Sequence, residues 1–325
     1  MIHRLQIYKS DCVNPYKNLA TEKYLLDNVA NDSCILFLWQ NKNTVVIGKN
    51  QNAWAECNCS LLEEEGAKLA RRISGGGAVF HDLGNLNFTF LSSSENYDLN
   101  KNLEVIKKAC SLAGISTEVS GRNDILADNR KFSGNAFYNT KDKSYHHGTI
   151  LISADKQRMQ RYLTPPKMKL EAKGIKSVQS RVVNLSELSP GLTCDAMANF
   201  LATAFELEYQ IKPDFMEMPE EDKLLKLYNE FSSRDYIYGS SIPFSFSLEE
   251  RFSWGYAELK FYIKNNLIQN FQMHTDSLDW SLSEKVKASL LNCRFDSESI
   301  KKVLFSSLPE IQAEDIFKII NKNLF

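Results

Sequence analysis

The chain has 325 residues, with 39 lysines and arginines against 40 aspartates and glutamates, so its formal net charge is −1. This balance disfavours a protein that binds nucleic acid or an anionic membrane through bulk charge. Hydrophobic residues make up 43% of the chain and charged residues 24%, which excludes a disordered, coiled-coil or collagen-like chain.

The apolar pattern along the first part of the chain predicts strands and helices in alternation. Asn14 and Pro15 are typical of a helix start, and the apolar spacing after them is helical. Polar turns at 41–43 and 128–130 each predict a β-hairpin. The predicted strands lie at 5–8, 35–39, 44–47, 68–72, 79–81, 85–91, 124–127, 131–138 and 145–153. Further helices are predicted at 63–65, 105–112, 195–206 and 220–231.

Hairpins with helices between them predict an α+β fold, in which a mixed, largely antiparallel sheet is flanked by helices. A Gly/Ser/Pro-rich stretch around 239–245 predicts a boundary between a domain of residues 1–245 and a small α+β domain of residues 246–325. In the small domain, a hairpin is expected to turn at 265–266, and helical patterns run from Ser283 to the end.

The N-terminal sequence, the length of the apolar runs and the pattern of cysteines together predict a cytoplasmic protein. No apolar run approaches the roughly 18 residues of a membrane span, and the N-terminal residues lack the apolar core of a secretory signal. Seven scattered cysteines do not form a disulfide framework. Cys57 and Cys59 are a close pair, but they lack the second pair that a zinc site requires.

Glycine is scarce, with 14 in 325 residues against a usual share of about 7%, yet positions 75, 76, 77 and 84 are all glycine. Three consecutive glycines between two strands let backbone N–H groups approach an anion without Cβ obstruction. Arg72 and His81 flank the cluster and suit charge-assisted hydrogen bonds. The spacing matches neither common nucleotide loop, and the alternative is a flexible bulge between strands.

A lysine follows the turn at 128–130. Because alternate side chains of a strand share a face, Lys131, Ser133 and Asn135 are predicted to point together, so the lysine could bind an anion among small polar neighbours. The alternative is an exposed lysine after a turn. His146 and His147 are adjacent on a strand and must face opposite ways, which disfavours a two-histidine metal site.

Four ordered motifs together resemble those of the bacterial lipoate-protein ligase A family: RRISGGGAVFHDLGN (71–85), SGRNDI (120–125), RKFSGNA (130–136) and HHGT (146–149). The resemblance continues at 45–52, 173–182 and 251–255, so it covers nearly the whole chain. It implies the catalytic fold shared by biotin ligases and class II aminoacyl-tRNA synthetases, with a small C-terminal accessory domain. It also implies an enzyme that uses ATP to convert lipoate to lipoyl-AMP, releases pyrophosphate, and transfers the lipoyl group to a specific lysine of a lipoyl domain.

The resemblance also implies roles for residues by their positions in these motifs. Lys131 is implied as the catalytic residue, in contact with both lipoate and ATP. The implied nucleotide contacts are Lys131, Arg72, Gly77, Ala78, Val79 and Phe80, and the implied lipoate contacts are Lys131, Gly75, Gly76 and His81. Lys173, Ser177 and Arg181 are implied in a loop that closes over the adenylate; they lie in a stretch, 155–181, with eight basic and two acidic residues.

The implied substrates and partners are small molecules and acceptor proteins. They are ATP with Mg²⁺ as the activating ion, lipoate or octanoate, and apo-lipoyl domains of 2-oxoacid dehydrogenase complexes or glycine cleavage H protein. No tightly bound prosthetic group, nucleic acid or membrane is expected, and Asp124 is the candidate metal ligand. Cations suit this chemistry, because a carboxylate that attacks a phosphate brings two anions together. Phe37, Trp39, Val46 and Phe88 could line an apolar slot for the lipoate tail.

Four alternatives remain at this stage. An ATP-independent octanoyl or lipoyl transferase would use a cysteine nucleophile, but residues 111–193 contain no cysteine. A transferase that uses preformed lipoyl-AMP is disfavoured by the lack of a transit peptide, and a biotin ligase by the lack of a Gly-Arg-Gly-Arg-x-Gly loop. A non-catalytic effector-binding protein is disfavoured because Arg72, the three glycines and Lys131 are all present.

Overall fold

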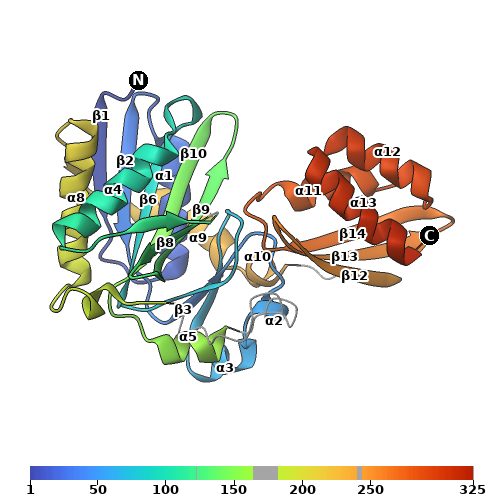
Figure 1. Ribbon diagram of the computed structural model, residues 1–325, viewed down its shortest axis with the longest axis horizontal. Helices are drawn as coiled ribbons and strands as arrows, with labels where there is room; N and C mark the ends of the chain where they lie inside the picture. The colour runs from blue at the N-terminus through green and yellow to red at the C-terminus, as the bar shows by residue number, and fades with distance from the viewer. Residues whose placement is uncertain (122, 164–181, 240–243, 325) are drawn as a thin grey trace.

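The computed structural model describes residues 1–121, 123–163, 182–239 and 244–324 (Figure 1). Its largest element is an eight-stranded sheet in the order β11-β1-β2-β6-β10-β9-β8-β7. The strands are β1 (Arg4–Lys9), β2 (Ser33–Trp39), β6 (Asn85–Ser93), β7 (Glu118–Ser120), β8 (Asp124–Ala127), β9 (Arg130–Asn139), β10 (Lys143–Leu151) and β11 (Asp214–Met216). Strands β11, β1 and β2 run parallel and the other neighbours antiparallel, so the predicted mixed, largely antiparallel sheet is confirmed.

Helices cover both faces of this sheet, as predicted. Helices α4 (Leu99–Leu112) and α8 (Cys194–Tyr209) lie side by side over one face and share an apolar core with it (Figure 1). Helices α1 (Pro15–Asn28) and α9 (Glu221–Ser232) pack on the other side. Asn14 caps α1 by accepting a hydrogen bond from the Tyr16 backbone N–H, which confirms the predicted helix start.

A second, three-stranded sheet faces the large sheet on the α1 side. Its order is β4-β3-β5, with β3 (Thr44–Ile47), β4 (Lys68–Arg71) and β5 (Val79–His81). One face carries residues of the α1 core, and the other is covered by α2 (Ala53–Glu56), α3 (Cys59–Glu64), α5 (Lys156–Tyr162) and α10 (Arg234–Tyr238).

The hairpin predicted at 41–43 is wrong, because β2 and β3 belong to different sheets. The residues of both strands are buried on both faces, so neither shows the alternation that would identify its partner. Asn41 in the connection is itself fully buried and hydrogen-bonded, so this segment carries the chain between two sheets rather than around an exposed turn.

The two other predicted hairpins are confirmed. Asp128 and Asn129 both have positive φ, at 51° and 57°, and form a two-residue turn between β8 and β9. Asn265 and Asn266 do the same between β13 (Gly255–Lys264) and β14 (Leu267–Thr275).

Strands β13 and β14 pair with β12 (Phe246–Phe252) in a third sheet, in the order β12-β13-β14. Helices α11 (Leu282–Leu290), α12 (Ser297–Ser307) and α13 (Glu310–Leu324) pack on this sheet and share with it a separate apolar core (Figure 1). In the part of the chain that the structure describes, no helix is long and apolar enough to cross a membrane.

Candidate functional site

A strip of buried polar side chains crosses the large sheet where the small sheet faces it. Thr89 of β6 is opposite His147 of β10, and Asn87 is opposite Thr149 in the next position of the same face. Thr89, Asn87 and His147 are all buried in an otherwise apolar core. Polar groups concentrated at one place in a core are typical of a binding or catalytic site.

The segment that joins β4 to β5 contains the three glycines and lies beside this strip. A Cβ at Gly76 would lie 3.9 Å from the Cβ of Ala136, which is opposite His147. Gly76 has φ +90°, a backbone conformation that residues with a side chain rarely adopt. The predicted glycine loop is therefore an ordered part of the site.

The Arg72 guanidinium holds the glycine loop in shape. Its N–H groups donate to the carbonyl oxygens of Gly75 (2.7 Å), Gly77 (2.8 Å) and Val46 (3.1 Å), and to Ser74 Oγ (3.1 Å). The guanidinium group is planar and its N–H donors point in fixed directions, which suits this set of acceptors.

Arg72 is also a buried charge without an acidic partner. Only 5% of the residue is exposed, and burial lowers its pKa to about 10, so it remains charged at neutral pH. Among the described residues, no carboxylate lies within ion-pair distance of its guanidinium. Its charge is met by carbonyl oxygens and, at longer range, by the Glu22 carboxylate, so an anion bound beside the loop would add to its stabilisation.

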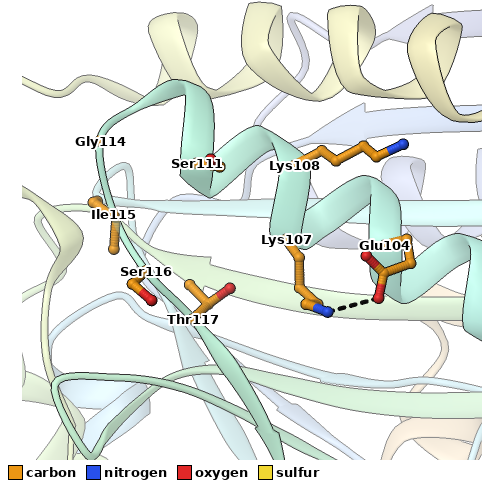
Figure 2. A pocket seen from close by; sticks show the side chains of 8 residues that line it. All are labelled: Glu104, Lys107, Lys108, Ser111, Gly114, Ile115, Ser116 and Thr117. Carbon is orange, nitrogen blue, oxygen red and sulfur yellow. Dashed lines mark hydrogen bonds and ion pairs between the residues drawn. The ribbon is translucent and has the colours of Figure 1, made fainter.

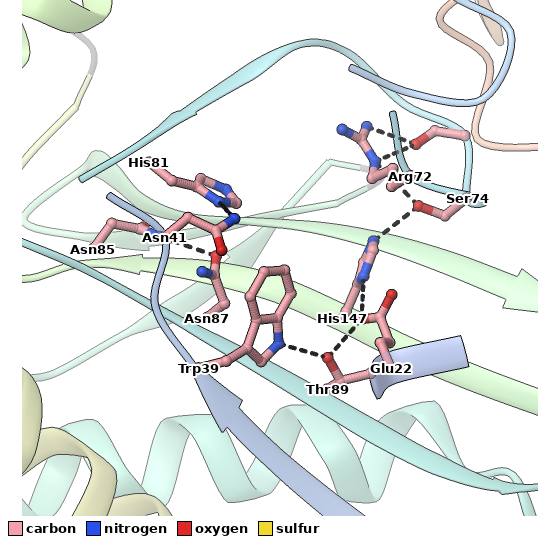
Figure 3. Close-up of polar contacts among 11 residues, drawn as sticks. Glu22, Trp39, Asn41, Arg72, Ser74, His81, Asn85, Asn87, Thr89 and His147 are labelled. Atoms are coloured by element: carbon pink, nitrogen blue, oxygen red, sulfur yellow. Dashed lines mark hydrogen bonds and ion pairs between the residues drawn. The ribbon is translucent and has the colours of Figure 1, made fainter. Parts of the chain in front are cut away.

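A chain of hydrogen bonds connects the glycine loop to the floor of the site (Figure 3). Ser74 Oγ lies 2.8 Å from His147 Nε2, and His147 Nδ1 lies 2.8 Å from Glu22 Oε1. Thr89 donates to the same Glu22 oxygen and accepts from the Trp39 indole N–H. These hydrogen bonds hold the glycine loop against β2, β6 and β10. Each side chain of the network is oriented by a hydrogen bond to its neighbour.

Sequence reasoning did not identify Glu22, Ser74, Thr89 and Trp39 as parts of one network. Glu22 offered a signal, because it lies on the buried side of α1 beside Leu19 and would be an isolated acid in an apolar core. The partners of Thr89 and Trp39 depend on pairing between strands far apart in the chain, which no local pattern reveals.

Lys131 lies at the other end of the polar strip. Its Nζ is 2.7 Å from Asp124 Oδ1, and about a third of its side chain is exposed, at 34%. A Cβ at Gly134 would lie 2.9 Å from Lys131 Nζ and 3.9 Å from Thr149 Oγ1. The ammonium group therefore projects over Gly134 towards Thr149, at a place that solvent and a ligand can reach.

The predicted shared face of Lys131, Ser133 and Asn135 is wrong. The register between β8 and β9 shifts between Ile125 and Leu126, and this bulge turns Lys131 to the side of Gly134. Ser133 and Asn135 instead contact each other on the opposite face.

The predicted opposite orientation of the two histidines is confirmed. His146 Nε2 lies 2.7 Å from Asn135 Oδ1, and its ring packs against Phe88 and Phe90 on the α4 side of the sheet. Phe88 therefore faces away from the strip, and its predicted place in an apolar slot is wrong. Phe37, Trp39 and Val46 do lie on the side of the strip, in the core beneath α1.

Gly75, Gly76 and Gly77 occupy different environments. A Cβ at Gly75 would clash with the carbonyl oxygen of Ser277 and lie 2.8 Å from that of Leu278. The Gly76 N–H donates to the Ser277 carbonyl oxygen at 2.9 Å. A Cβ at Gly77 would meet nothing within 4 Å. Gly75 thus fits a close approach of the segment between β14 and α11, whereas Gly77 faces open space.

The same segment makes further contacts across the site. The Trp280 ring packs 4.5 Å from that of Tyr138, and Lys49 Nζ lies 4.4 Å from the Trp280 ring centroid. Asn50 donates to the Trp280 carbonyl oxygen and accepts from the Thr275 N–H. The C-terminal elements are therefore held directly against the glycine loop.

Gly75→Ala should lower the free energy of unfolding by about 1–3 kcal/mol, because its Cβ would push the Ser277 backbone away. Gly77→Ala is the matched control and should change stability by less than about 0.5 kcal/mol. Urea unfolding followed by tryptophan fluorescence measures both. Equal stability of the two variants would contradict the close approach at Gly75.

The remaining predicted nucleotide residues follow Gly77. Ala78 and Val79 are half-buried, and the Phe80 side chain is buried on the far face of β5, where its ring contacts Tyr162. His81 is buried on the near face, with its ring 6.1 Å from that of Trp39. Lys173, Ser177 and Arg181 lie outside the described residues.

Neither a cluster of metal ligands nor the groove at the end of α4 contributes to this site in the described residues. Within the described ranges, no group of three His, Cys, Asp or Glu side chains could hold a metal ion. A groove at the end of α4 lies on the opposite side of the large sheet, and there Lys107 is paired with Glu104 (Figure 2).

Two buried histidines near the strip are neutral at physiological pH. Burial lowers the pKa of His81 and of His146 from 6.5 to about 3. The unfolded chain takes up these protons near pH 6.5, whereas the folded chain does so only near pH 3. Stability is therefore lost as the pH falls from about 6.5 towards 3.

Lowering the pH from 7 to 5 should cost about 2 kcal/mol of unfolding free energy for each of these histidines. His146→Gln keeps a donor for Asn135 but cannot titrate, so its stability should fall by about 2 kcal/mol less over this range. Urea titrations at both pH values measure the difference, with exposed His3→Gln as the control. A wild-type slope in His146→Gln would refute the buried neutral state.

The sequence matches known families over most of its length. Residues 14–206 match the family described as lipoyl protein ligase A/B catalytic domain, and residues 241–324 match the bacterial lipoate protein ligase C-terminus. The chain is 39% identical to lipoate-protein ligase A of Bdellovibrio bacteriovorus, across 94% of this chain and 93% of that protein. It is 40% identical to lipoate-protein ligase A of Psychrobacter cryohalolentis, across 92% of this chain and 91% of that protein.

Solved structures show the same fold. The crystal structure of P. falciparum LipL1 in complex with lipoate superposes with a TM-score of 0.88 at 32% identity, covering 98% of this chain and all of that one. A bipartite lipoate protein ligase of Thermoplasma acidophilum, studied with its E2 lipoyl domain, gives a TM-score of 0.66 at 25% identity. That match covers 76% of this chain and all of the other.

Proposed function

Because the chain belongs to the lipoate-protein ligase A family, we propose that it activates lipoate with ATP and transfers the lipoyl group to a lysine of a lipoyl domain. The observation that carries this proposal is the convergence of a buried arginine, a glycine loop that is open at Gly77 and a partly exposed lysine on one polar strip. Cations and backbone donors around one point suit two anions that must react with each other.

In the first step, a carboxylate oxygen of lipoate attacks the α-phosphorus of ATP, and the bond to pyrophosphate breaks. Lys131 is a partly exposed cation, and its ammonium would donate to the carboxylate and the α-phosphate as charge builds between them. Arg72 would act through its positive field and through the loop that it shapes, because its N–H groups already hold loop carbonyls.

The proposed substrate contacts follow the motifs. For the nucleotide they are Lys131, Arg72, Gly77, Ala78, Val79 and Phe80. For lipoate they are Lys131, Gly75, Gly76 and His81. The open environment of Gly77 supports a ligand there, and the buried side chain of Phe80 leaves its backbone as the contact. Phe37, Trp39 and Val46 would surround the apolar tail.

Mg²⁺ is proposed as the activating ion. Among the described residues, the carboxylate that pairs with Lys131 is that of Asp124, and a single carboxylate fits an ion that takes most of its ligands from water and nucleotide phosphates. When bound, such an ion neutralises phosphate charge. Asp124 is the residue that would hold it.

In the second step, the ε-amine of the acceptor lysine attacks the acyl carbonyl and AMP leaves. The mixed anhydride must be kept from water until then. We propose that the segment containing Lys173, Ser177 and Arg181 provides this cover. The acceptors would be apo-lipoyl domains of 2-oxoacid dehydrogenases or glycine cleavage H protein, and the T. acidophilum ligase studied with its E2 lipoyl domain supports this class of partner.

We also propose that residues 1–245 form the catalytic domain and residues 246–325 an accessory domain. The separate apolar core of the C-terminal sheet and helices supports this division.

The activation step can be tested without an acceptor protein. With radiolabelled pyrophosphate, the chain should exchange label into ATP only when lipoate and Mg²⁺ are both present. An effector-binding protein, or a transferase that needs preformed lipoyl-AMP, would bind ligand but give no lipoate-dependent exchange. Absence of exchange in a folded preparation would therefore exclude the proposed activation.

A further inference from the structure

Three buried polar atoms in the neighbourhood of Trp39 have no hydrogen-bond partner among the described residues. They are His81 Nε2, Asn85 Oδ1 and Asn87 Nδ2. The three residues are 3%, 0% and 1% exposed, and Figure 3 shows them on the same side of Trp39. Because buried polar groups are nearly always paired, three such atoms together indicate a partner that the chain itself does not supply.

A chain of hydrogen bonds determines which nitrogen of His81 carries the proton. The Asn18 amide nitrogen donates to the backbone carbonyls of Cys12 and Gln40, which fixes its orientation. One of its two hydrogens is shared with Asn41 Oδ1 in a three-centre bond, so Asn41 presents its NH₂ group to His81 Nδ1. His81 Nδ1 therefore accepts, and the ring proton lies on the unpartnered Nε2.

The Asn85 and Asn87 amides are bonded to each other. Asn85 Nδ2 donates to Asn87 Oδ1 at 3.0 Å, which leaves one donor nitrogen, Asn87 Nδ2, and one acceptor oxygen, Asn85 Oδ1, without a partner. Exchanging the two amide orientations leaves the same complement. The cluster thus offers two donors, one from His81 and one from the amide pair, and one acceptor.

Strand pairing connects these atoms to Lys131 across the large sheet. Asn87 is opposite Trp39 on one side and Thr149 on the other, and Thr149 accepts from the N–H of Gly134, over which Lys131 projects. Neighbouring strands are about 4.8 Å apart, so β6 lies about 10 Å from β9. A medium-chain acid with its carboxylate at Lys131 would place its far end beside Asn87, His81 and Trp39.

We propose that His81 Nε2–H and the Asn85–Asn87 amide pair recognise the dithiolane sulfurs of lipoate and so discriminate against unsubstituted fatty acids of the same length. The sulfurs accept from the two donors, and the free amide oxygen takes the S–H of the reduced form or a bridging water. An octanoyl tail has no acceptor and would leave buried donors unpaired, which costs affinity. This inference rests on the proposed function, because it takes lipoate as the substrate.

The test compares lipoate with octanoate in wild type, Asn87→Leu and His81→Phe. Pyrophosphate exchange gives kcat and KM for each acid, and calorimetry gives binding without turnover. Each variant should lower the preference for lipoate about tenfold, through weaker lipoate binding and unchanged or stronger octanoate binding. Ser92→Ala is the control, because Ser92 is a buried polar residue of the same strand, bonded to the Ser93 carbonyl oxygen.

The outcomes separate the two proposals. Wild-type protein that uses neither acid contradicts the proposed function itself. Variants whose ratio of lipoate to octanoate affinity equals that of wild type overturn the inference. If such variants also have a lowered melting temperature, the partner of the three atoms is a structural water and not the substrate. If Asn87→Leu does not fold, Asn87→Ser, which is smaller and polar, replaces it in the same comparison.

Discussion

Lys131→Met should reduce lipoate-dependent pyrophosphate exchange by at least about 10²–10³-fold, the loss seen when one charge-stabilising donor is removed from an active site. Its ammonium is a partly exposed cation of the site that projects over Gly134 towards Thr149. The fold should survive, because Lys131 is partly exposed and its pair with the half-exposed Asp124 is worth about 1 kcal/mol or less.

Circular dichroism and the urea midpoint measure the fold of this variant, and pyrophosphate exchange measures its activity. Lys141→Met, at an exposed turn position between β9 and β10, is the matched control and should retain both. Exchange at the wild-type rate in a folded Lys131→Met protein would disprove the catalytic role assigned to this lysine.

Arg72→Lys should impair both stability and activation. Lysine keeps the charge but has a compact ammonium in place of a planar fork, so it cannot serve Gly75, Gly77 and Val46 together. Buried carbonyls left without donors should cost about 3–5 kcal/mol in total. The glycine loop would lose its shape, and exchange should fall by at least about 10²-fold in the protein that remains folded.

The neighbouring arginine provides the control for a purely structural loss. Arg71 is also buried, but it donates to carbonyls of the segment 48–51 and of Tyr236 and Ile237, and none of its bonds within the described residues goes to the glycine loop itself. Arg71→Lys should therefore lose comparable stability with a smaller loss of exchange per folded molecule. Equal losses of exchange in the two variants would show that Arg72 has no special role in the site.

The parts of the fold that local chemistry determines were predictable from sequence. Asp128 and Asn129, like Asn265 and Asn266, tolerate positive φ, so their turns could be located without knowledge of the rest of the chain. The choice of partner for β2 and β3 was not predictable, because both strands are buried on both faces and their pairing is decided by tertiary packing.

The site was predictable where its residues stand together in the chain. The glycine loop, Arg72 and the region of Lys131 were recognisable from contiguous motifs. The direction of Lys131 was not, because a bulge reverses the face and no local signal marks it. Glu22, Thr89 and His147 come from three separate elements, and only the assembled sheet and helix bring them into hydrogen-bond contact.

Intact-mass spectrometry of an acceptor protein tests the central claim most directly. An apo-lipoyl domain is incubated with the chain, lipoate, ATP and Mg²⁺, and its mass is measured before and after. We expect a gain of one lipoyl group that requires ATP, is accompanied by AMP, and disappears when the acceptor lysine is replaced by arginine. Equal modification from free lipoate without ATP would contradict the account.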